Sequence, residues 1–263
     1  MKFDLQIDPP YLNAPGMLGF SPDSRGPVDL DRLGAFVTNP LSLEPRSAAH
    51  AARYLDYPGG FLLHTGHPNP GLRTALRRYA PHWERSSVPV IVHLLVERRE
   101  DANRMAQRLE GLPGVAALEL GLPPDLPASG WAAIARELEV ELPVILRLPL
   151  ERAAEIGAAL LHSGAADRLA ALSLGAPRGL LPVSPPGQGR PVLQSGRLYG
   201  PGIFPLALAA LPLLHQGGLP LIAGGGVYRP EQAAALFAAG AAAVQLDSLL
   251  WRGERVDLEN WPR

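Results

Sequence analysis

Three consecutive glycines after an apolar run are the residues of this chain whose type and spacing most directly suggest chemistry. They lie in LIAGGGVYRP (221–230), and the segment that follows, PEQAAALFAAG, has the apolar spacing of a helix. Glycines between a strand and a helix let backbone N–H groups approach a phosphate closely. Gly224–Gly226, together with Gly200, are therefore the predicted phosphate cradle, although tight packing of the strand against the helix would also explain them.

The next apolar run ends in Asp247, whose carboxylate would repel a nearby phosphate. One interpretation is that Asp247 caps a helix or pairs with Arg229 and points away from the cradle. Another is that Arg197 or Arg229 bridges the carboxylate to the phosphate. Without such a bridge, the sequence predicts that any phosphate is bound weakly.

Ionisable side chains interrupt three other apolar runs, namely His93 in VIVHLL, Glu119 in ALELGL and Arg147 in VILRLP. Such groups are costly to bury unless they are paired. Arg147 either pairs with Glu119 on the adjacent strand or contacts an anionic ligand. Glu119 could act as a general base with a raised pKa, and His93 is either a second proton carrier or a satisfied core residue.

Two further histidines, His64 and His67, lie in the irregular segment HTGHPNPG. Together with His93, Glu119 and Asp247 they offer ligands that suit Zn²⁺ and similar ions. No HxH or HExxH spacing accompanies them. No metal is therefore predicted, and a metal-assisted hydrolase is kept as an alternative function.

The composition excludes several classes of protein. The chain has 263 residues, 47% hydrophobic and 19% charged, with a formal net charge of −1, which argues against nucleic-acid binding. It shows neither a signal peptide nor an apolar run that could span a membrane, so we expect a cytoplasmic protein with no membrane partner. It has no cysteine, and Lys2 is its only lysine, which excludes a thiol nucleophile and a Schiff-base lysine in the body of the chain.

Short apolar runs alternate with segments of helical spacing along the chain. The runs predict strands at 12–16, 35–38, 89–95, 115–120, 143–148, 169–174, 219–223 and 242–246. The helical segments are 100–112, 130–141, 151–164, 205–218 and 230–240. About eight such units predict an α/β fold, a single (β/α)8 barrel domain over residues 1–263. An open, doubly wound sheet is the alternative.

Two features of the later half concern access to the barrel. The Pro- and Gly-rich segment Gly175–Gly202 is predicted to be a long loop without regular structure and a candidate lid. Few residues follow Ser248, so the last helix is expected to be short or absent. A homodimer or a partner subunit would then cover the gap.

Six motifs give the chain a family resemblance over nearly its whole length. They are LGAFVTNPLSLEPR (33–46), GHPNPG (66–71), ELGLPP (119–124), LPVILRLP (142–149), YGPGIFPLAL (199–208) and LIAGGGV followed by AAVQLDS (221–248). In order and spacing they resemble the dihydroorotate dehydrogenase-like flavoproteins, which are FMN-binding (β/α)8 barrels that oxidise dihydroorotate to orotate. The resemblance implies FMN as cofactor, with its phosphate on the amides after the seventh and eighth strands.

The resemblance and the residues together define three sets of candidates. The catalytic candidates are Glu119 and His93. The cofactor-binding candidates are Ala14, Asn39, Arg147, Gly200, Gly224, Gly225, Gly226 and Ser248. The candidates for a pocket that takes a small-molecule ligand are His64, His67, Asn69 and Ser173, although Asn69 in HPNPG is also a typical turn residue.

The chain departs from the family pattern at several functional positions. Leu122 stands where the family has its catalytic Cys or Ser, and leucine cannot accept a proton. Leu63, Glu119, Pro124 and Ser173 replace asparagines, Asn39 and Arg147 replace lysines, and Asp247 replaces a glycine. We therefore expect a divergent, FMN-binding oxidoreductase whose substrate is not dihydroorotate. The alternative is a barrel that has lost the flavin and serves as a binding protein or a structural subunit.

Overall fold

Eight parallel strands close into a barrel in the computed structural model, which describes residues 5–50, 53–184 and 190–262. The hydrogen-bonded order is β1-β13-β12-β9-β8-β7-β6-β2, and a parallel bridge between Leu12 and Ala35 closes the ring. The strands are β1 (Tyr11–Asn13), β2 (Phe36–Val37), β6 (Val90–Leu95), β7 (Val115–Gly121), β8 (Val144–Pro149), β9 (Ala171–Gly175), β12 (Leu221–Gly224) and β13 (Ala243–Leu246). All eight predicted strands are confirmed, and the open-sheet alternative is wrong. A short β3 (Leu41–Ser42) adds to β6.

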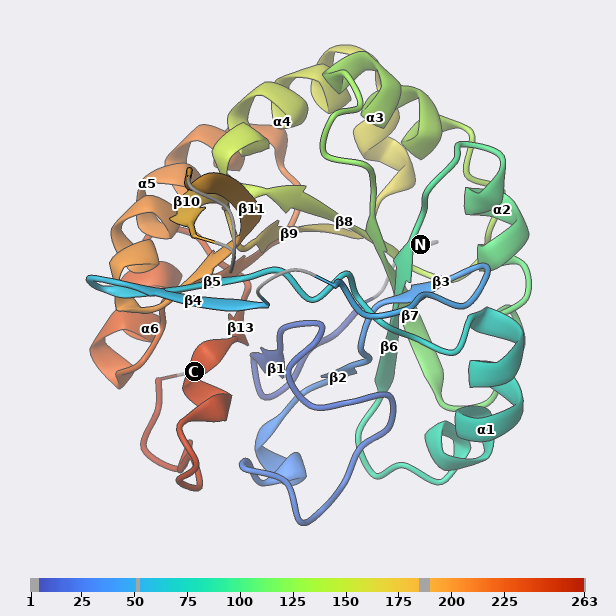
Figure 1. The fold of residues 1–263 in the computed structure, drawn as a ribbon. Coiled ribbons are helices and arrows are strands. Elements are labelled where there is room, and N and C mark those ends of the chain that lie inside the picture. Colours follow the sequence, from blue (N-terminus) through green and yellow to red (C-terminus); the bar gives the residue numbers. More distant parts are fainter. Residues whose placement is uncertain (1–4, 51–52, 185–189, 263) are drawn as a thin grey trace.

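Helices surround the barrel (Figure 1). They are α1 (Leu72–Glu84), α2 (Asp101–Ala106), α3 (Ala128–Arg136), α4 (Ala153–His162), α5 (Phe204–Leu214) and α6 (Pro230–Ala238). Short 3-10 helices are η1 (Leu30–Arg32), η2 (Leu150–Arg152), η3 (Ala165–Arg168), η4 (Pro201–Ile203), η5 (His215–Gly217) and η6 (Ser248–Trp251). The five predicted helices are present, but α1 was not predicted.

Helix α4 shows how the sequence places these elements. Its buried residues Ala153, Ile156, Gly157 and Leu160 follow the i, i+3, i+4, i+7 pattern of a helix with one apolar face. Gly164, in the left-handed region at φ 70°, follows the helix and lets the chain turn back toward β9. The buried face packs on the outside of the strands, so the helix fixes β8 and β9 from without.

The inside of the barrel holds a layer of apolar side chains that receives at least one residue from every barrel strand. Its members are Leu12, Ala35, Val37, Ile91, Ala117, Ile145, Ala171, Ile222 and Ala243. Side chains alternate between the two faces of a strand, so the residues two positions further along also point inward. The side chains two positions further along each strand therefore form a second layer above the apolar layer, toward the carboxyl ends of the strands. We call that end the barrel mouth.

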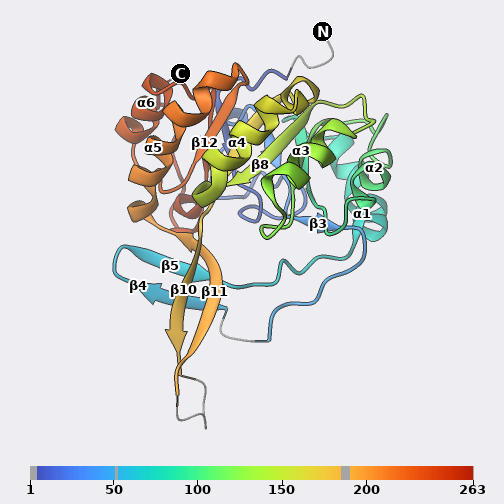
Figure 2. The same ribbon diagram turned by 90° about the horizontal axis from the view of Figure 1, so that it is seen from above.

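A second, antiparallel sheet lies across the barrel mouth (Figure 2). Its order is β10-β11-β5-β4, with β4 (Tyr54–Tyr57), β5 (Gly60–Leu63), β10 (Arg178–Val183) and β11 (Val192–Tyr199). The segment 175–202, predicted to be a structureless loop, is largely the β10–β11 hairpin, so that prediction is wrong. Part of the predicted lid, residues 185–189, lies outside the described residues.

The end of the chain packs beneath the start of β1. After β13 the only helix in the described residues is η6, in agreement with a short or absent last helix. Trp261 then contacts Tyr11 edge-to-face at 5.7 Å between ring centroids, and Val256 forms a parallel bridge with Val28. In the part of the chain that the structure describes, no helix has the length and apolar character needed to cross a membrane.

Candidate ligand site at the barrel mouth

A layer of polar side chains lies directly above the apolar layer inside the barrel. We call it the polar layer, and it consists of His93, Glu119, Arg147, Ser173 and Gln245, from β6, β7, β8, β9 and β13. Each is two positions beyond a member of the apolar layer, so strand alternation alone points all five inward. The strands therefore bring together residues that are far apart in sequence.

Glu119 is the centre of the polar layer and is fully buried. Its Oε1 accepts hydrogen bonds from Ser173 Oγ at 2.6 Å and from Gln245 Nε2 at 2.8 Å. The same oxygen lies 3.2 Å from Arg147 Nη1, which also donates to Gln245 Oε1. The other oxygen, Oε2, lies 2.6 Å from His93 Nδ1. Both oxygens are thus taken by the chain itself, and Arg147 forms the predicted pair with Glu119.

The charges around Glu119 shift its pKa in the direction opposite to the one that the sequence predicts. Burial alone would raise the pKa of Glu119, but the Arg147 charge and the hydrogen bonds from His93 and Ser173 outweigh it and lower that pKa. The predicted raised pKa of Glu119 is therefore wrong, whereas its role as a catalytic residue stays a prediction. Burial lowers the pKa of His93 despite its hydrogen bond to Glu119. A neutral His93 therefore donates Nδ1–H to an ionised Glu119, which leaves Nε2 free to accept a proton.

His93 Nε2 points toward the barrel mouth. A Cβ placed on Gly121 would lie 3.0 Å from this nitrogen, and Gly121 lines the cavity described next. Gln245 was not among the predicted site residues, although its amide joins Arg147 to Glu119. Its polar side chain within the apolar run AAVQL, two residues before Asp247, was the signal that could have identified it.

A cavity of about 660 Å³ opens above the polar layer, and we call it the mouth cavity. It lies over the loops that follow β1, β2, β6 and β7 and under the antiparallel sheet. Its lining residues are Pro15, Gly16, Met17, Asn39, Pro40, Arg46, Leu63, His64, Thr65, Gly66, His67, Pro68, Leu95, Val96, Glu97, Gly121, Leu122, Pro123, Pro124, Asp125, Arg178, Gly196, Arg197, Tyr199 and Trp251. Its size suits a small-molecule ligand.

The predicted pocket residues divide between this cavity and the protein interior. His64 and His67 line the mouth cavity, as does Asn39. Ser173 does not, because it is buried in the polar layer. Asn69 is also buried, and its Oδ1 accepts from the amides of Ser42 at 3.3 Å and Gly71 at 3.0 Å. In this structure Asn69 thus shapes the turn ahead of α1.

The wall of the mouth cavity carries three arginines, Arg46, Arg178 and Arg197, and two carboxylates, Glu97 and Asp125. Arg46 is paired with Glu97, but in the described residues no carboxylate lies within salt-bridge distance of Arg178 or Arg197. Arg197 is half-buried and its Nη1 donates to Ala176 O at 3.3 Å. Burial, with the nearby Arg197 charge, lowers the pKa of His67 to about 3, so His67 is neutral at pH 7. The wall therefore presents unpaired guanidinium groups to a ligand.

The predicted phosphate cradle lies to one side of this cavity. Gly224, Gly225 and Gly226 are buried at the end of β12, and the turn at Gly200 packs against them. The Asp247 side chain reaches the glycine loop, where its Oδ2 accepts a hydrogen bond from Gly226 N at 3.3 Å. The Asp247 side chain also caps η6, as one interpretation of the sequence predicts, but it points into the cradle and not away from it.

Three aromatic rings lie at the edge of the mouth cavity. The Phe61 ring stacks on Tyr199 at 5.7 Å and on Trp251 at 6.1 Å between centroids. Tyr199 and Trp251 line the mouth cavity, whereas none of Gly224–Gly226, Asp247 and Ser248 does. The cavity and the predicted phosphate cradle are thus two separate places in this fold.

These observations test whether FMN fits the residues present, and it does not. The cradle amide of Gly226 is already bonded to Asp247, and the polar layer satisfies its own hydrogen bonds. The one buried side-chain N or O atom without a partner in the described residues is Trp131 Nε1, in α3 and remote from the barrel mouth. The Gly226 amide and the side chains of the polar layer are therefore already bonded within the chain, where a flavin or its phosphate would need them.

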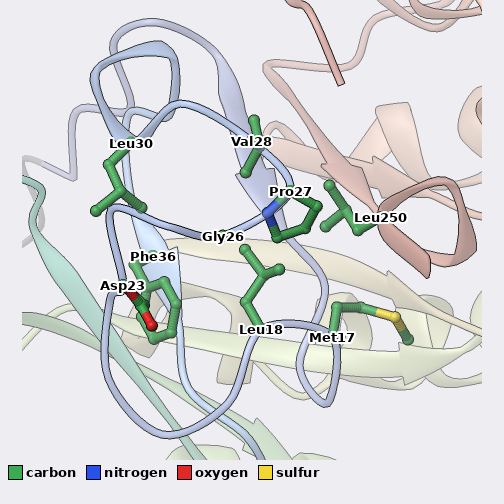
Figure 3. Close-up of a pocket in the computed structure, with 9 residues that line it drawn as sticks. All are labelled: Met17, Leu18, Asp23, Gly26, Pro27, Val28, Leu30, Phe36 and Leu250. Carbon is green, nitrogen blue, oxygen red and sulfur yellow. The ribbon is translucent and has the colours of Figure 1, made fainter. Parts of the chain in front are cut away.

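A smaller cavity of about 290 Å³ lies beside the loop that follows β1 (Figure 3). Leu18, Val28, Phe36 and Leu250 make its wall mostly apolar. Its one carboxylate, Asp23, is already bonded to Arg25 at 3.1 Å. Among the described residues, no group of three or more His, Asp or Glu side chains is placed to hold a metal ion. The candidate chemistry is thus confined to the mouth cavity and the polar layer beneath it.

Comparison with known proteins places the chain in a family. No family model matches it. The dihydroorotate dehydrogenase B (NAD(+)) catalytic subunit of Desulforudis audaxviator (strain MP104C) is 33% identical, over 91% of this chain and 82% of that protein. The chain belongs to the dihydroorotate dehydrogenase family. Proteins of the same name from Desulforamulus reducens (31% identical, 90% and 82% covered) and Pelobacter propionicus (29% identical, 92% and 84% covered) are also similar.

Within this oxidoreductase family the chain is a divergent member. Leu122, Leu63 and Pro124, the positions at which the sequence is expected to depart from the family pattern, all line the mouth cavity. Their apolar side chains offer no proton acceptor and no amide to a ligand there. Glu119 and Ser173, two further positions of this kind, are hydrogen-bonded to each other in the polar layer.

Proposed function

We propose that this barrel binds a small organic anion in its mouth cavity and does not oxidise dihydroorotate. The observation that carries the proposal is Arg197, whose half-buried guanidinium faces a cavity of about 660 Å³ with no carboxylate partner in the described residues. An arginine so placed recognises a carboxylate or a similar planar anion through paired hydrogen bonds. Arg178 adds a second positive charge at the rim.

The role of Arg197 can be tested by ligand binding. We expect Arg197→Gln to weaken the binding of dihydroorotate or of comparable small carboxylates by about tenfold to a hundredfold, because a charged hydrogen bond is lost. Calorimetric titration of both proteins measures the change. Arg73→Gln, at an exposed position of α1, is the matched control. Equal affinities in wild type and Arg197→Gln would refute the proposed site.

Dihydroorotate oxidation is the activity that the relatives' names suggest, and we expect it to be absent. Leu122 stands where the family resemblance implies the base that abstracts the proton from dihydroorotate, and leucine cannot accept a proton. The measurement is orotate formation by absorbance, with the protein as purified and again after addition of FMN. A rate near the typical enzyme value of about 10 per second would contradict the proposal.

A second candidate is an FMN-dependent oxidoreductase with a substrate other than dihydroorotate. Membership of the family favours it, and His93 Nε2, just below the cavity floor, would be its proton acceptor. Copurified flavin in the protein would support this candidate, whereas a colourless protein supports a binding barrel. The relatives are named as catalytic subunits, which supports a partner subunit or a homodimer for this chain as well.

A further inference from the structure

The loops after β12 and β13 form an anion-binding amide pair, the backbone N–H groups of Gly226 and Ser248. In the structure both amides donate to the carboxylate of Asp247, Gly226 N to Oδ2 at 3.3 Å and Ser248 N to Oδ1 at 2.6 Å. Ser248 Oγ adds a third contact to Oδ1 at 3.1 Å. Asp247 is only 4% exposed, so water is largely kept from the carboxylate. The amide pair already holds an anion that belongs to the chain.

Backbone geometry holds the amide pair in this position. Gly226 adopts φ 70°, which favours glycine, and a Cβ there would lie 2.7 Å from Gly200 O and from Phe204 N. The Gly200 turn therefore closes over the glycine loop. Asp247 is two residues beyond the inward-facing Gln245, so strand alternation directs its carboxylate over the barrel and toward Gly226.

Only a cation close to the Asp247 carboxylate would allow a second anion beside it, and the Arg147 charge, which acts against the burial that raises the pKa of Asp247, forms no salt bridge to it. Among the described residues no arginine or histidine forms a salt bridge with Asp247. Arg229 is exposed at the start of α6, and Arg197 donates to Ala176 O instead. Burial raises the pKa of Asp247, against the lowering effect of the Gly226 and Ser248 amides. A phosphate about 4 Å away would lose nearly three decades of affinity by repulsion.

We propose that Asp247 is a built-in anion that fills the Gly226–Ser248 amide pair in place of a phosphate, so that the native chain binds neither FMN nor inorganic phosphate there. The chain keeps the backbone of a phosphate-binding barrel, but its amides donate to a carboxylate of the chain itself. This inference concerns a place separate from the mouth cavity and does not depend on the anion bound by Arg197.

The test is a titration of wild type and Asp247→Gly with FMN, with riboflavin as the ligand that lacks the phosphate. Inorganic phosphate is titrated separately by calorimetry. We expect no saturable FMN binding by wild type in the micromolar range. Asp247→Gly should bind FMN at least a hundredfold more tightly than wild type and should prefer it to riboflavin, because the amides are then free. Asp167→Gly, at an exposed position in η3, is the matched control.

A conservative substitution protects the test against a folding defect. Asp247→Asn keeps the size of the side chain and removes its charge, so it should also tighten FMN and phosphate binding, by a smaller factor. Tight FMN binding by wild type, or no gain in either folded variant, would overturn the inference. Binding of carboxylates in the mouth cavity, measured on the same variants, should not change. The two proposals can therefore fail independently of each other.

Discussion

Replacing Glu119 by alanine is expected to destabilise the protein by about 3–5 kcal/mol, because it leaves a buried guanidinium without its counter-charge. Glu119 is fully buried, and the side chain of its partner Arg147 is only 10% exposed. Ser173 and Gln245 would lose their acceptor in the same step. Urea unfolding followed by circular dichroism measures the loss.

Two further variants, a control and a double replacement, establish that the loss comes from the unpaired charge. Glu139→Ala, at an exposed position, is the matched control and should change stability by about 0.5 kcal/mol or less. Replacing both partners, with Glu119→Leu and Arg147→Met, should recover much of the loss, since buried pairs often exchange for apolar residues at little cost. A Glu119→Ala protein as stable as the control would mean that the polar layer is not closed as described.

The strands could be predicted from the sequence because parallel barrel strands are buried on both faces. VIVHLL, which becomes β6, is buried at five of its six positions, so the apolar run is visible without any periodicity. Each run is also bounded by Pro, Gly or charged residues, which fixes its ends to within a few residues. The order of the runs along the chain was then enough to predict a barrel.

Helix α1 and the β10–β11 hairpin could not be predicted in the same way. Helix α1 does have apolar residues at helical spacing, including Leu72, Ala75 and Trp83, but Pro81 lies inside it and is typical of a helix breaker, so the segment was missed. Strand β10 alternates exposed and half-buried residues, and Pro and Gly near it are typical of a loop. Strand β11 pairs on its other side with β5, which lies more than a hundred residues earlier, and such pairing leaves no local signal.

The polar layer was partly predictable from strand alternation. The pair Arg147–Glu119 followed from two buried charges at equivalent positions of adjacent strands. The direction of Asp247 could have been deduced in the same way, because it shares the parity of Gln245 and must point inward if β13 stays regular. What the sequence could not show is that Gly226 would supply a donor to that carboxylate, since this depends on how two loops approach each other.

The polar layer and Asp247 point to one conclusion about this member of the family. In each place a charged side chain of the chain fills a position where the family resemblance implies a ligand group. Arg147 lies where a flavin contact is implied but bonds to Glu119 and Gln245, and Asp247 lies where a phosphate is implied but bonds to Gly226. Both observations support the proposal that Asp247 takes the place of a phosphate, while Arg178 and Arg197, which form no salt bridge in the described residues, line the mouth cavity.

The free energy of unfolding at acid pH should also depend on Glu119. The pKa of this carboxyl is lowered in the folded chain from an ordinary value of 4.5, mainly by the Arg147 charge acting against burial. A lowered carboxyl pKa contributes stability that is present above pH 4.5 and lost as the pH falls below it. His93, with a pKa lowered from 6.5 by burial, begins to cost stability at a higher pH, as the unfolded chain takes up a proton.

We therefore expect the free energy of unfolding to fall below about pH 6.5, as the unfolded chain protonates His93 and His67, and more steeply below pH 4.5, where Glu119 adds roughly 1.4 kcal/mol per pH unit. In Glu119→Gln the steep part should be lost, because an amide does not titrate, although the variant is less stable near neutral pH. Asp247, whose pKa is raised by burial, acts in the opposite sense and makes the observed slope shallower. Urea titrations at half-unit steps from pH 7 to pH 3, with Glu139→Gln as the exposed control, measure the difference. A Glu119→Gln profile parallel to that of wild type below pH 4.5 would show that Glu119 is not held ionised by the polar layer.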